Sequence, residues 1–184
     1  MKLNREIYCK NCKSWWPYYI EEDDLKDKNE IEIECYICKK NIKIKLNSIT
    51  IYLARTFSVS DSKYKYAVEI KNNFKLFINI IDPYEYEKEI KIGDYDRNYK
   101  KIVDLDKHLI NNSDVCTFFI NNPTFGTISE MFYSQQIGKP IYIYNSNGIY
   151  ESDVWLKSYS SNGKIYLDCK EMFREILKKY VFEK

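Results

Sequence analysis

Four cysteines near the N-terminus most constrain how this chain can fold. They form two C-x2-C pairs, Cys9 with Cys12 and Cys35 with Cys38, separated by 22 residues. Each pair can place two thiolates on one side of a tight turn, and two such turns offer the four soft ligands that tetrahedral zinc prefers. The spacing predicts a closed, structural zinc site held by these four side chains. The alternative is two unrelated pairs of reduced core cysteines.

The segments beside the second pair alternate apolar and charged residues, over Ile31–Glu34 and Ile42–Leu46. This period of two is typical of an antiparallel ribbon that is half exposed to water. Residues 1–46 therefore resemble a zinc ribbon. Many ribbons bind nucleic acid, but these residues include ten basic and nine acidic side chains, a balance that argues against a surface that follows phosphates.

Four aromatic residues follow the first cysteine pair and have two possible uses. They can stack on bases, or they can pack against the rest of the chain or against a partner. We favour packing, so nucleic acid is possible but not the favoured partner. The four residues are Trp15, Trp16, Tyr18 and Tyr19.

From about residue 47, short apolar runs alternate with amphipathic stretches, which predicts alternating strands and helices. The expected strands are 49–54, 74–81, 115–120, 141–144 and 165–167, and the expected helices are 62–73, one from about 98, one from about 126 and the C-terminal tail. This order predicts an α/β fold, a flavodoxin- or Rossmann-like, mostly parallel sheet of about five strands with flanking helices. We expect residues 1–46 to form the ribbon and residues 47–184 the α/β domain.

The charge and hydropathy patterns set limits on location and partners. The formal net charge is only +2, so bulk electrostatics require no polyanionic partner. No run approaches the length of about 18 apolar residues that a membrane helix needs, and the N-terminus lacks the apolar run of a signal peptide. We therefore expect a soluble, cytoplasmic protein without a membrane partner and with reduced cysteines.

The loop after the third expected strand contains the most informative residues of the α/β part. It carries Asn122, Thr124, Gly126 and Thr127, and Glu130 follows about one turn into the next helix. Free N–H groups at such a helix start can bind an anion or a ribose, and the carboxylate can attack an anomeric carbon as an N-glycosidic bond breaks. The alternative is that the glutamate only stabilises the helix start.

This loop resembles the signature of the nucleoside 2-deoxyribosyltransferase superfamily, a G-x-x-x-E segment followed by Gly138-Lys139-Pro140 before the next strand. Three further matches occur in order: the strand 51–54, Asp106, and the strand entry 113–115. The resemblance covers about residues 49–180. It implies that Glu130 is the nucleophile, that Asp106 orients or protonates the base or the nucleophile, and that Tyr52 positions Glu130 or the sugar.

One departure from the family pattern bears on the ligand. Transferases of free nucleosides often have an Asp six residues before the nucleophile, where this chain has Thr124. The segment 123–126 is more similar to the Pro-Ser-x-Gly loop of the related 2′-deoxynucleoside 5′-phosphate N-glycosidases. A hydroxyl beside free helix N–H groups suits a phosphate, which an Asp would repel, so we expect a nucleotide as the ligand. Arg55, after the first strand, can add a cation at the same edge. In another departure, the bulky residues 131–133 follow the glutamate where the family often has small ones, so we expect a reshaped pocket.

The resemblance therefore predicts a nucleotide N-glycosidase or deoxyribosyltransferase. It also implies a homo-oligomer, because neighbouring subunits commonly complete the site in this superfamily. Two other classes stay open: an NAD-cleaving or nucleotide-sensing domain of a defence system, and a non-catalytic module that binds a partner through the ribbon. Consumption of NAD distinguishes the first of these, and the absence of any cleavage distinguishes the second.

Overall fold

The computed structural model describes residues 2–25, 27–55, 72, 74, 76–87, 95–122 and 124–183. These residues form two compact units. The first unit contains the chain up to Ile49, a segment that ends at Asn79, and the chain from Phe173 onward. The second unit contains a segment that starts at Thr50, together with Ile80–Met172. The C-terminal segment thus groups with the cysteine-rich residues. The boundary expected between residues 46 and 47 stays a prediction, and the helix expected over 62–73 lies outside the described residues apart from residue 72.

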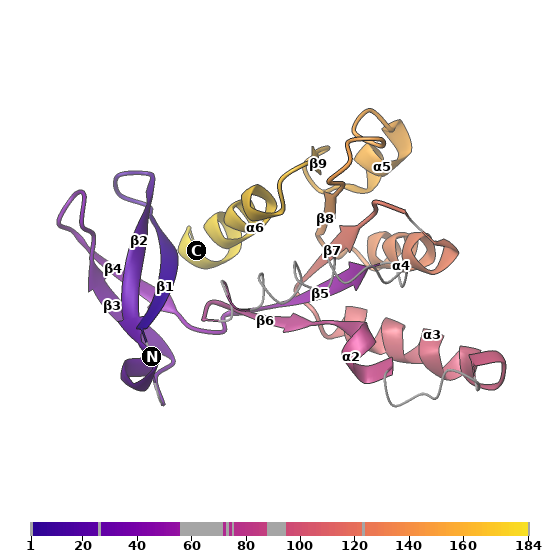
Figure 1. Cartoon of the computed structure of the whole chain (residues 1–184), viewed down its shortest axis with the longest axis horizontal. Coiled ribbons are helices and arrows are strands. Elements are labelled where there is room, and N and C mark those ends of the chain that lie inside the picture. Colours follow the sequence, from indigo (N-terminus) through magenta and orange to yellow (C-terminus); the bar gives the residue numbers. More distant parts are fainter. Residues whose placement is uncertain are drawn as a thin grey trace. The chain divides into compact units, whose positions relative to one another are not determined.

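Two antiparallel hairpins make up the cysteine-rich part (Figure 1). β1 (Lys2–Cys9) pairs with β2 (Ser14–Glu21), and β3 (Glu30–Glu34) pairs with β4 (Asn41–Lys45). A 3-10 turn, η1 (Glu22–Leu25), follows β2. The alternation that predicted β3 and β4 is present, because their isoleucines are buried and their charged residues are exposed. The hairpin β1–β2 was not predicted as strands.

The C-terminal segment packs on the first hairpin. α6 (Cys169–Leu177) continues into a π-helical turn, η3 (Lys178–Phe182). The ring of Phe182 lies 5.7 Å from Trp15 and 6.4 Å from Tyr8, while Arg174 forms an ion pair with Glu6 at 2.7 Å. Trp15 is therefore used in packing, as the sequence favoured, and its packing partner is the C-terminal tail.

The second unit is organised by a five-stranded parallel sheet with the order β6-β5-β7-β8-β9. Its strands are β5 (Ile49–Arg55), β6 (Ile78–Ile81), β7 (Val115–Phe119), β8 (Ile141–Tyr144) and β9 (Ile165–Tyr166). In order of appearance this is 2-1-3-4-5, the flavodoxin-like arrangement, in which ligands bind at the carboxyl ends of the first and third strands. The predicted α/β fold is confirmed, and it places the candidate site beside β5 and β7.

Four helices belong wholly to this unit: α2 (Pro83–Glu87), α3 (Tyr95–Asn111), α4 (Phe125–Gln136) and α5 (Val154–Tyr159). α3 and α4 start close to the predicted positions, whereas α2 and α5 are too short for the periodicity to reveal them. The second strand is shorter than predicted, because the chain turns at Leu76–Phe77 before β6 begins. No described helix is long and apolar enough to cross a bilayer, and a cytoplasmic location stays a prediction.

The face of the sheet that α4 covers carries the apolar core of this unit. Tyr52 pairs in register with Cys116, and Ala54 with Phe118, so side chains of β5 and β7 alternate onto the same face. All four are fully buried, and Met131 of α4 joins them in one cluster. Figure 1 shows β5, β7 and β8 side by side. Glu130, which precedes Met131, is thereby placed next to this core.

Candidate active site and metal centre

The start of α4 is built around Thr124. This residue has extended backbone angles, and its hydroxyl accepts a hydrogen bond from the Thr127 amide at 3.3 Å. The hydroxyls of Thr124 and Thr127 also lie 3.1 Å apart. A threonine in this role satisfies one of the free N–H groups that every helix start presents. The two threonines predicted to bind substrate therefore also fix where α4 begins, and the exposed Gly126 lies between them.

The Glu130 side chain points back along α4 toward this start. A methyl group placed on Gly126 would lie 4.0 Å from Oε1 of Glu130 and 3.6 Å from the Thr124 hydroxyl. Side chains on a helix lean toward its N-terminus, which explains this direction. The geometry gathers Thr124, Gly126 and Glu130 at the carboxyl edge of β7, as the sequence predicted.

Two further predicted residues converge on Glu130 from other elements. Tyr52 comes from β5 and Asp106 from α3. Burial raises the pKa of the Tyr52 phenol, and the charges of Glu130 and then Asp106 raise it further, so both carboxyl groups lie near this hydroxyl. The Tyr52 hydroxyl is consequently neutral and retains its proton at any physiological pH. The structure thus brings together the three residues for which the resemblance implies catalytic roles.

One buried polar atom of this site has no partner among the described residues. Oδ1 of Asp106 is inaccessible and makes no hydrogen bond there, as is also the case for Trp16 Nε1 and Ser48 Oγ elsewhere in the chain. The buried Tyr52 hydroxyl has the Glu130 carboxyl group as its neighbour. An unsatisfied buried polar group costs on the order of 1–3 kcal/mol. Such groups are unusual in a native structure and need an explanation, for which a bound ligand is one candidate. Burial also raises the pKa of Asp106 to about 6, so its carboxyl group can carry a proton close to neutral pH.

An asparagine network fixes the loop between β7 and α4, and no sequence pattern indicated this network. Asn145 follows β8, is fully buried, and donates to the Ile120 carbonyl at 3.5 Å and to Oδ1 of Asn121 at 3.4 Å. The backbone N–H of Ser146 donates to the same Oδ1 at 2.7 Å, and the side-chain amide of Asn121 donates to the Ser146 hydroxyl at 2.6 Å. The loop is therefore tied to the neighbouring strand end. The run Asn145–Gly148 signals only a turn in the sequence, because network partners are distant along the chain.

Two of the family-like motifs lie at the opposite, amino edge of the sheet. Asp114 accepts from the Thr50 amide through its carboxylate at 2.7 Å and donates its own amide to the Thr50 carbonyl at 2.7 Å. The Lys139 ammonium donates to the carbonyls of Asn111 and Ser113, which close α3. Cations stabilise helix C-termini. These motifs thus secure the sheet and α3 at the edge away from the candidate site.

The remaining predicted residues are placed less completely. Arg55 is the last residue of β5 and pairs with Phe119, and its side chain lies outside the described part of the chain. Asn122 is exposed in the loop before α4. Of the bulky residues after Glu130, Met131 is in the core and Phe132 is 47% exposed. These two residues therefore point in different directions from α4.

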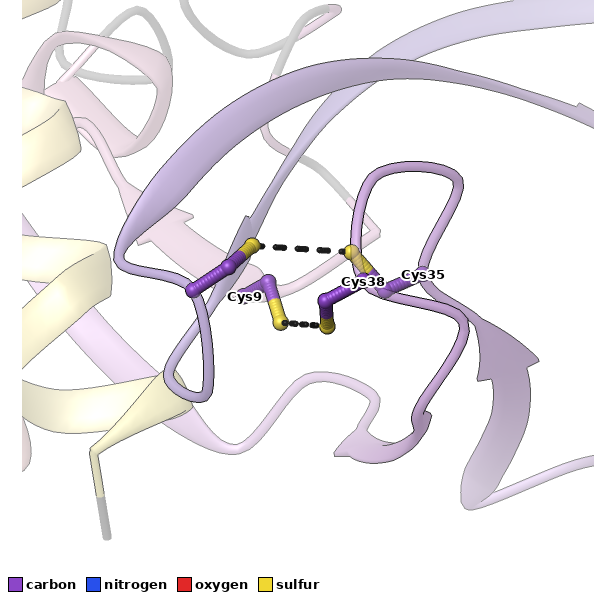
Figure 2. A group of neighbouring side chains, drawn as sticks. Cys9, Cys35 and Cys38 are labelled. Carbon is purple, nitrogen blue, oxygen red and sulfur yellow. Dashed lines mark hydrogen bonds between the residues drawn. The ribbon is translucent and has the colours of Figure 1, made fainter.

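The four cysteines of the N-terminal unit come together in one cluster, as predicted. All of their sulfur atoms lie within 4.8 Å of one another, with Cys9 3.7 Å from Cys38 and Cys12 3.8 Å from Cys35 (Figure 2). A tetrahedron with metal–sulfur bonds of about 2.3 Å has edges of about 3.8 Å. The sulfur–sulfur bond of a disulfide is far shorter, about 2 Å. The donor set and its spacing therefore fit one tetrahedral metal ion.

Both cysteine turns have the same local geometry. The residue after each pair, Lys13 or Lys39, has a positive φ of 56° or 59°, and its amide donates to the carbonyl of the first cysteine at 2.7 or 2.9 Å. Burial opposes ionisation of Cys9, but the amides of Cys12 and Asn11 outweigh it and lower the pKa of this thiol to about 7. Burial and the neighbouring thiols instead raise the pKa of Cys12 to about 11, because four thiols this close do not all ionise without a cation. A bound metal ion would supply that charge, since the thiolate is the form that binds a metal.

Comparison with known proteins rests on structure. No protein-family model matches the sequence, and no curated protein matches it. Among solved structures, the chain is similar to a 2-deoxyribosyltransferase from the psychrotolerant bacterium Bacillus psychrosaccharolyticus, with a TM-score of 0.51 and 18% identity, over 66% of this chain and 88% of that chain. At 18% sequence identity, this similarity shows a shared fold and nothing more. The chain therefore has the fold of a 2-deoxyribosyltransferase, as its sequence motifs predicted, together with an N-terminal cysteine cluster consistent with a zinc ribbon.

Proposed function

We propose that this chain cleaves the N-glycosidic bond of a deoxynucleoside 5′-monophosphate, as an N-glycosidase or a deoxyribosyltransferase. The observation that carries the proposal is the convergence of Glu130, Asp106 and Tyr52 at the carboxyl edge of the sheet, where Oδ1 of Asp106 is buried without a hydrogen-bond partner among the described residues. The likeness to a 2-deoxyribosyltransferase supports the same reaction class.

The proposed reaction has two displacements. An oxygen of Glu130 attacks C1′ of the sugar as the bond from C1′ to the base nitrogen breaks, and the bonding electrons leave with the base. Asp106, whose pKa is about 6, supplies a proton to the departing base. Water, or the nitrogen of a second base, then attacks C1′, gives its proton to the Asp106 carboxylate and releases the Glu130 carboxylate. The buried, neutral Tyr52 hydroxyl holds Glu130 or the sugar in position.

A nucleotide is favoured over a free nucleoside by the chemistry at the start of α4. Thr124 presents an exposed hydroxyl there, 3.1 Å from the hydroxyl of the buried Thr127, and the described part of α4 has no acidic residue in its first turn. A phosphate is attracted by helix N–H groups and is not repelled by hydroxyls. Asn122 and Gly126 border the same place, and Arg55 follows at the end of β5. We further propose that the cysteine cluster holds a structural zinc ion and that the chain forms a homo-oligomer, which light scattering can test.

The experiment is a product assay with the zinc-loaded full chain. Deoxynucleoside monophosphates, free deoxynucleosides, ribonucleotides and NAD are incubated separately, and released base is quantified by chromatography. We expect base release from a deoxynucleoside monophosphate. Glu130→Gln should lower the rate at least about a hundredfold, because an amide is a far weaker nucleophile than a carboxylate. The matched control is Glu151→Gln, which makes the same change at an exposed position.

Each alternative outcome has a definite meaning. Base release that is equally fast in Glu130→Gln would contradict the proposed nucleophile. Consumption of NAD alone would indicate the NAD-cleaving class, and no release from any compound would indicate a binding module. Thermal unfolding of both variants should match that of the parent chain, so that a loss of activity is not a loss of fold.

A further inference from the structure

The charges of the cysteine-rich hairpins are separated in space, although they nearly cancel in number. The segment 21–30 contains six of the nine acidic residues of residues 1–46. The two cysteine turns, 9–13 and 35–40, contain four lysines and no acidic residue. We call Lys10, Lys13, Lys39 and Lys40 the knuckle lysines, and all four are exposed.

The strand register places these two groups at opposite ends of the first hairpin. Cys9 pairs with Ser14 at the metal end, and Lys2 pairs with Glu21 at the other end, seven pairs away. At about 3.3 Å per residue, this separation is roughly 23 Å. That exceeds the screening length of about 8 Å at physiological ionic strength. The acidic end therefore does little to cancel the potential at the metal end.

The metal cluster itself brings the knuckle lysines together. Because the four sulfur atoms lie within 4.8 Å of one another, the two turns that carry the lysines meet at a single end (Figure 2). Four thiolates on a divalent ion offset two of the four lysine charges, so this end stays positive. Glu34 forms an ion pair with Lys39 at 3.9 Å, but both side chains are more than half exposed and such a pair is weak.

Exposed apolar side chains stand among these charges. Tyr36 is 74% exposed and Ile37 is 52% exposed, at the tip of the second cysteine turn. The Lys39 ammonium lies 4.9 Å from the centre of the Tyr36 ring. An aromatic ring next to cations is the combination that binds single strands, because bases stack on the ring while lysines contact phosphates. An acidic peptide would use the lysines but would gain little from an exposed ring.

We propose that the metal end of the hairpins binds single-stranded nucleic acid, with the knuckle lysines on the phosphates and Tyr36 as a stacking platform. This surface is independent of the proposed glycosidic cleavage, so either can fail without the other. The total charge of residues 1–46 argued against a nucleic-acid partner, because a total ignores where the strands place each charge. The knuckle lysines lie together at one end, so this surface is positive although the total is nearly zero.

The test is a titration of a short, fluorescein-labelled oligothymidylate with the zinc-loaded full chain, followed by anisotropy at several salt concentrations. Four phosphate contacts predict a slope of about −3 for the logarithm of affinity against that of salt. Lys10→Gln combined with Lys40→Gln should reduce the slope by about half. The matched control, Lys43→Gln combined with Lys45→Gln, removes two exposed lysines from β4 and should leave the slope unchanged.

Stacking is tested separately. Tyr36→Leu should weaken binding about fivefold or more at every salt concentration with the slope unchanged. Tyr19→Leu, at a ring that is 64% exposed on β2, should have no effect. No binding at the lowest salt concentration, equal losses from both lysine pairs, or equal competition by polyglutamate of the same charge would each overturn the proposal. Zinc content measured for each variant verifies that the hairpins are intact.

Discussion

Replacing Asp106 by Asn should stabilise the second unit, and the gain should depend on pH. Asp106 is 8% exposed, and burial raises the pKa of its carboxyl group from 3.8 to about 6. The folded chain therefore retains a proton between these values that the unfolded chain has released. Lowering the pH through this window stabilises the native state, and the full cost of burying the charge is present about one pH unit above the folded-state pKa of about 6.

The size of the effect follows from the shift. Each pKa unit corresponds to 1.36 kcal/mol, so a rise of about two units costs the native state about 3 kcal/mol at neutral pH. Asn has nearly the same shape and never ionises, so Asp106→Asn removes this cost but keeps a buried polar oxygen. The stability difference between variant and parent should therefore grow by about 3 kcal/mol from roughly pH 3 to pH 7 and then stay constant.

Urea unfolding followed by circular dichroism across this pH range measures the difference. Hydrogen exchange of peptides from β5 and β7 assigns it to the second unit. Asp104→Asn, at an exposed position on the same helix, is the matched control and should follow the parent chain at every pH. Metal release at acidic pH affects all three chains alike. A difference that is independent of pH, or a variant that loses stability as the pH rises, would refute the reasoning.

Two further predictions concern the amino edge of the sheet and the cysteine cluster. Lys139→Met should lower the free energy of unfolding by about 1–2 kcal/mol, because two carbonyls at the end of α3 lose a charged donor. Thermal unfolding measures this change, and Lys101→Met, at an exposed position of α3, is the control. Cys12→Ser should abolish stoichiometric zinc and shift tryptophan emission to longer wavelength, whereas Cys169→Ser, outside the cluster, should retain the metal. A full equivalent of tightly bound zinc in Cys12→Ser would count against the four-ligand site.

The parts of the fold that could be predicted are those with short-range signals. The two cysteine pairs predicted a cluster because four thiolates at such spacing can serve one ion, and the five apolar runs predicted a parallel sheet. The hairpin β1–β2 was missed because Trp15, Trp16, Tyr18 and Tyr19 do not alternate with polar residues. One reason lies in the C-terminal tail, since Trp15 contacts Phe182, which is far away in sequence.

The site residues were predicted through a resemblance, since spacing alone left each of them with a structural alternative. Glu130 in the first turns of a helix is an ordinary stabilising residue until its neighbours are known. Its environment depends on Tyr52 and Asp106, which lie on different elements. No local sequence pattern predicts that these distant residues come together. Asn145 shows the same limit, because a single buried amide that joins two strand ends has no periodicity.

The motif residues at the amino edge of the sheet differ in hydrogen bonding from the candidate residue Asp106. At the amino edge, Asp114 and Lys139 have their partners within the chain, so their motifs are explained by stability alone. At the carboxyl edge, Oδ1 of Asp106 is buried without a partner in the described part of the chain. A buried polar group without a hydrogen bond lowers the stability of the native state, and this cost must be offset by another interaction. The hydroxyls of a bound sugar can supply the missing hydrogen bond. A ligand that fits should therefore raise the stability of the second unit as well as react there.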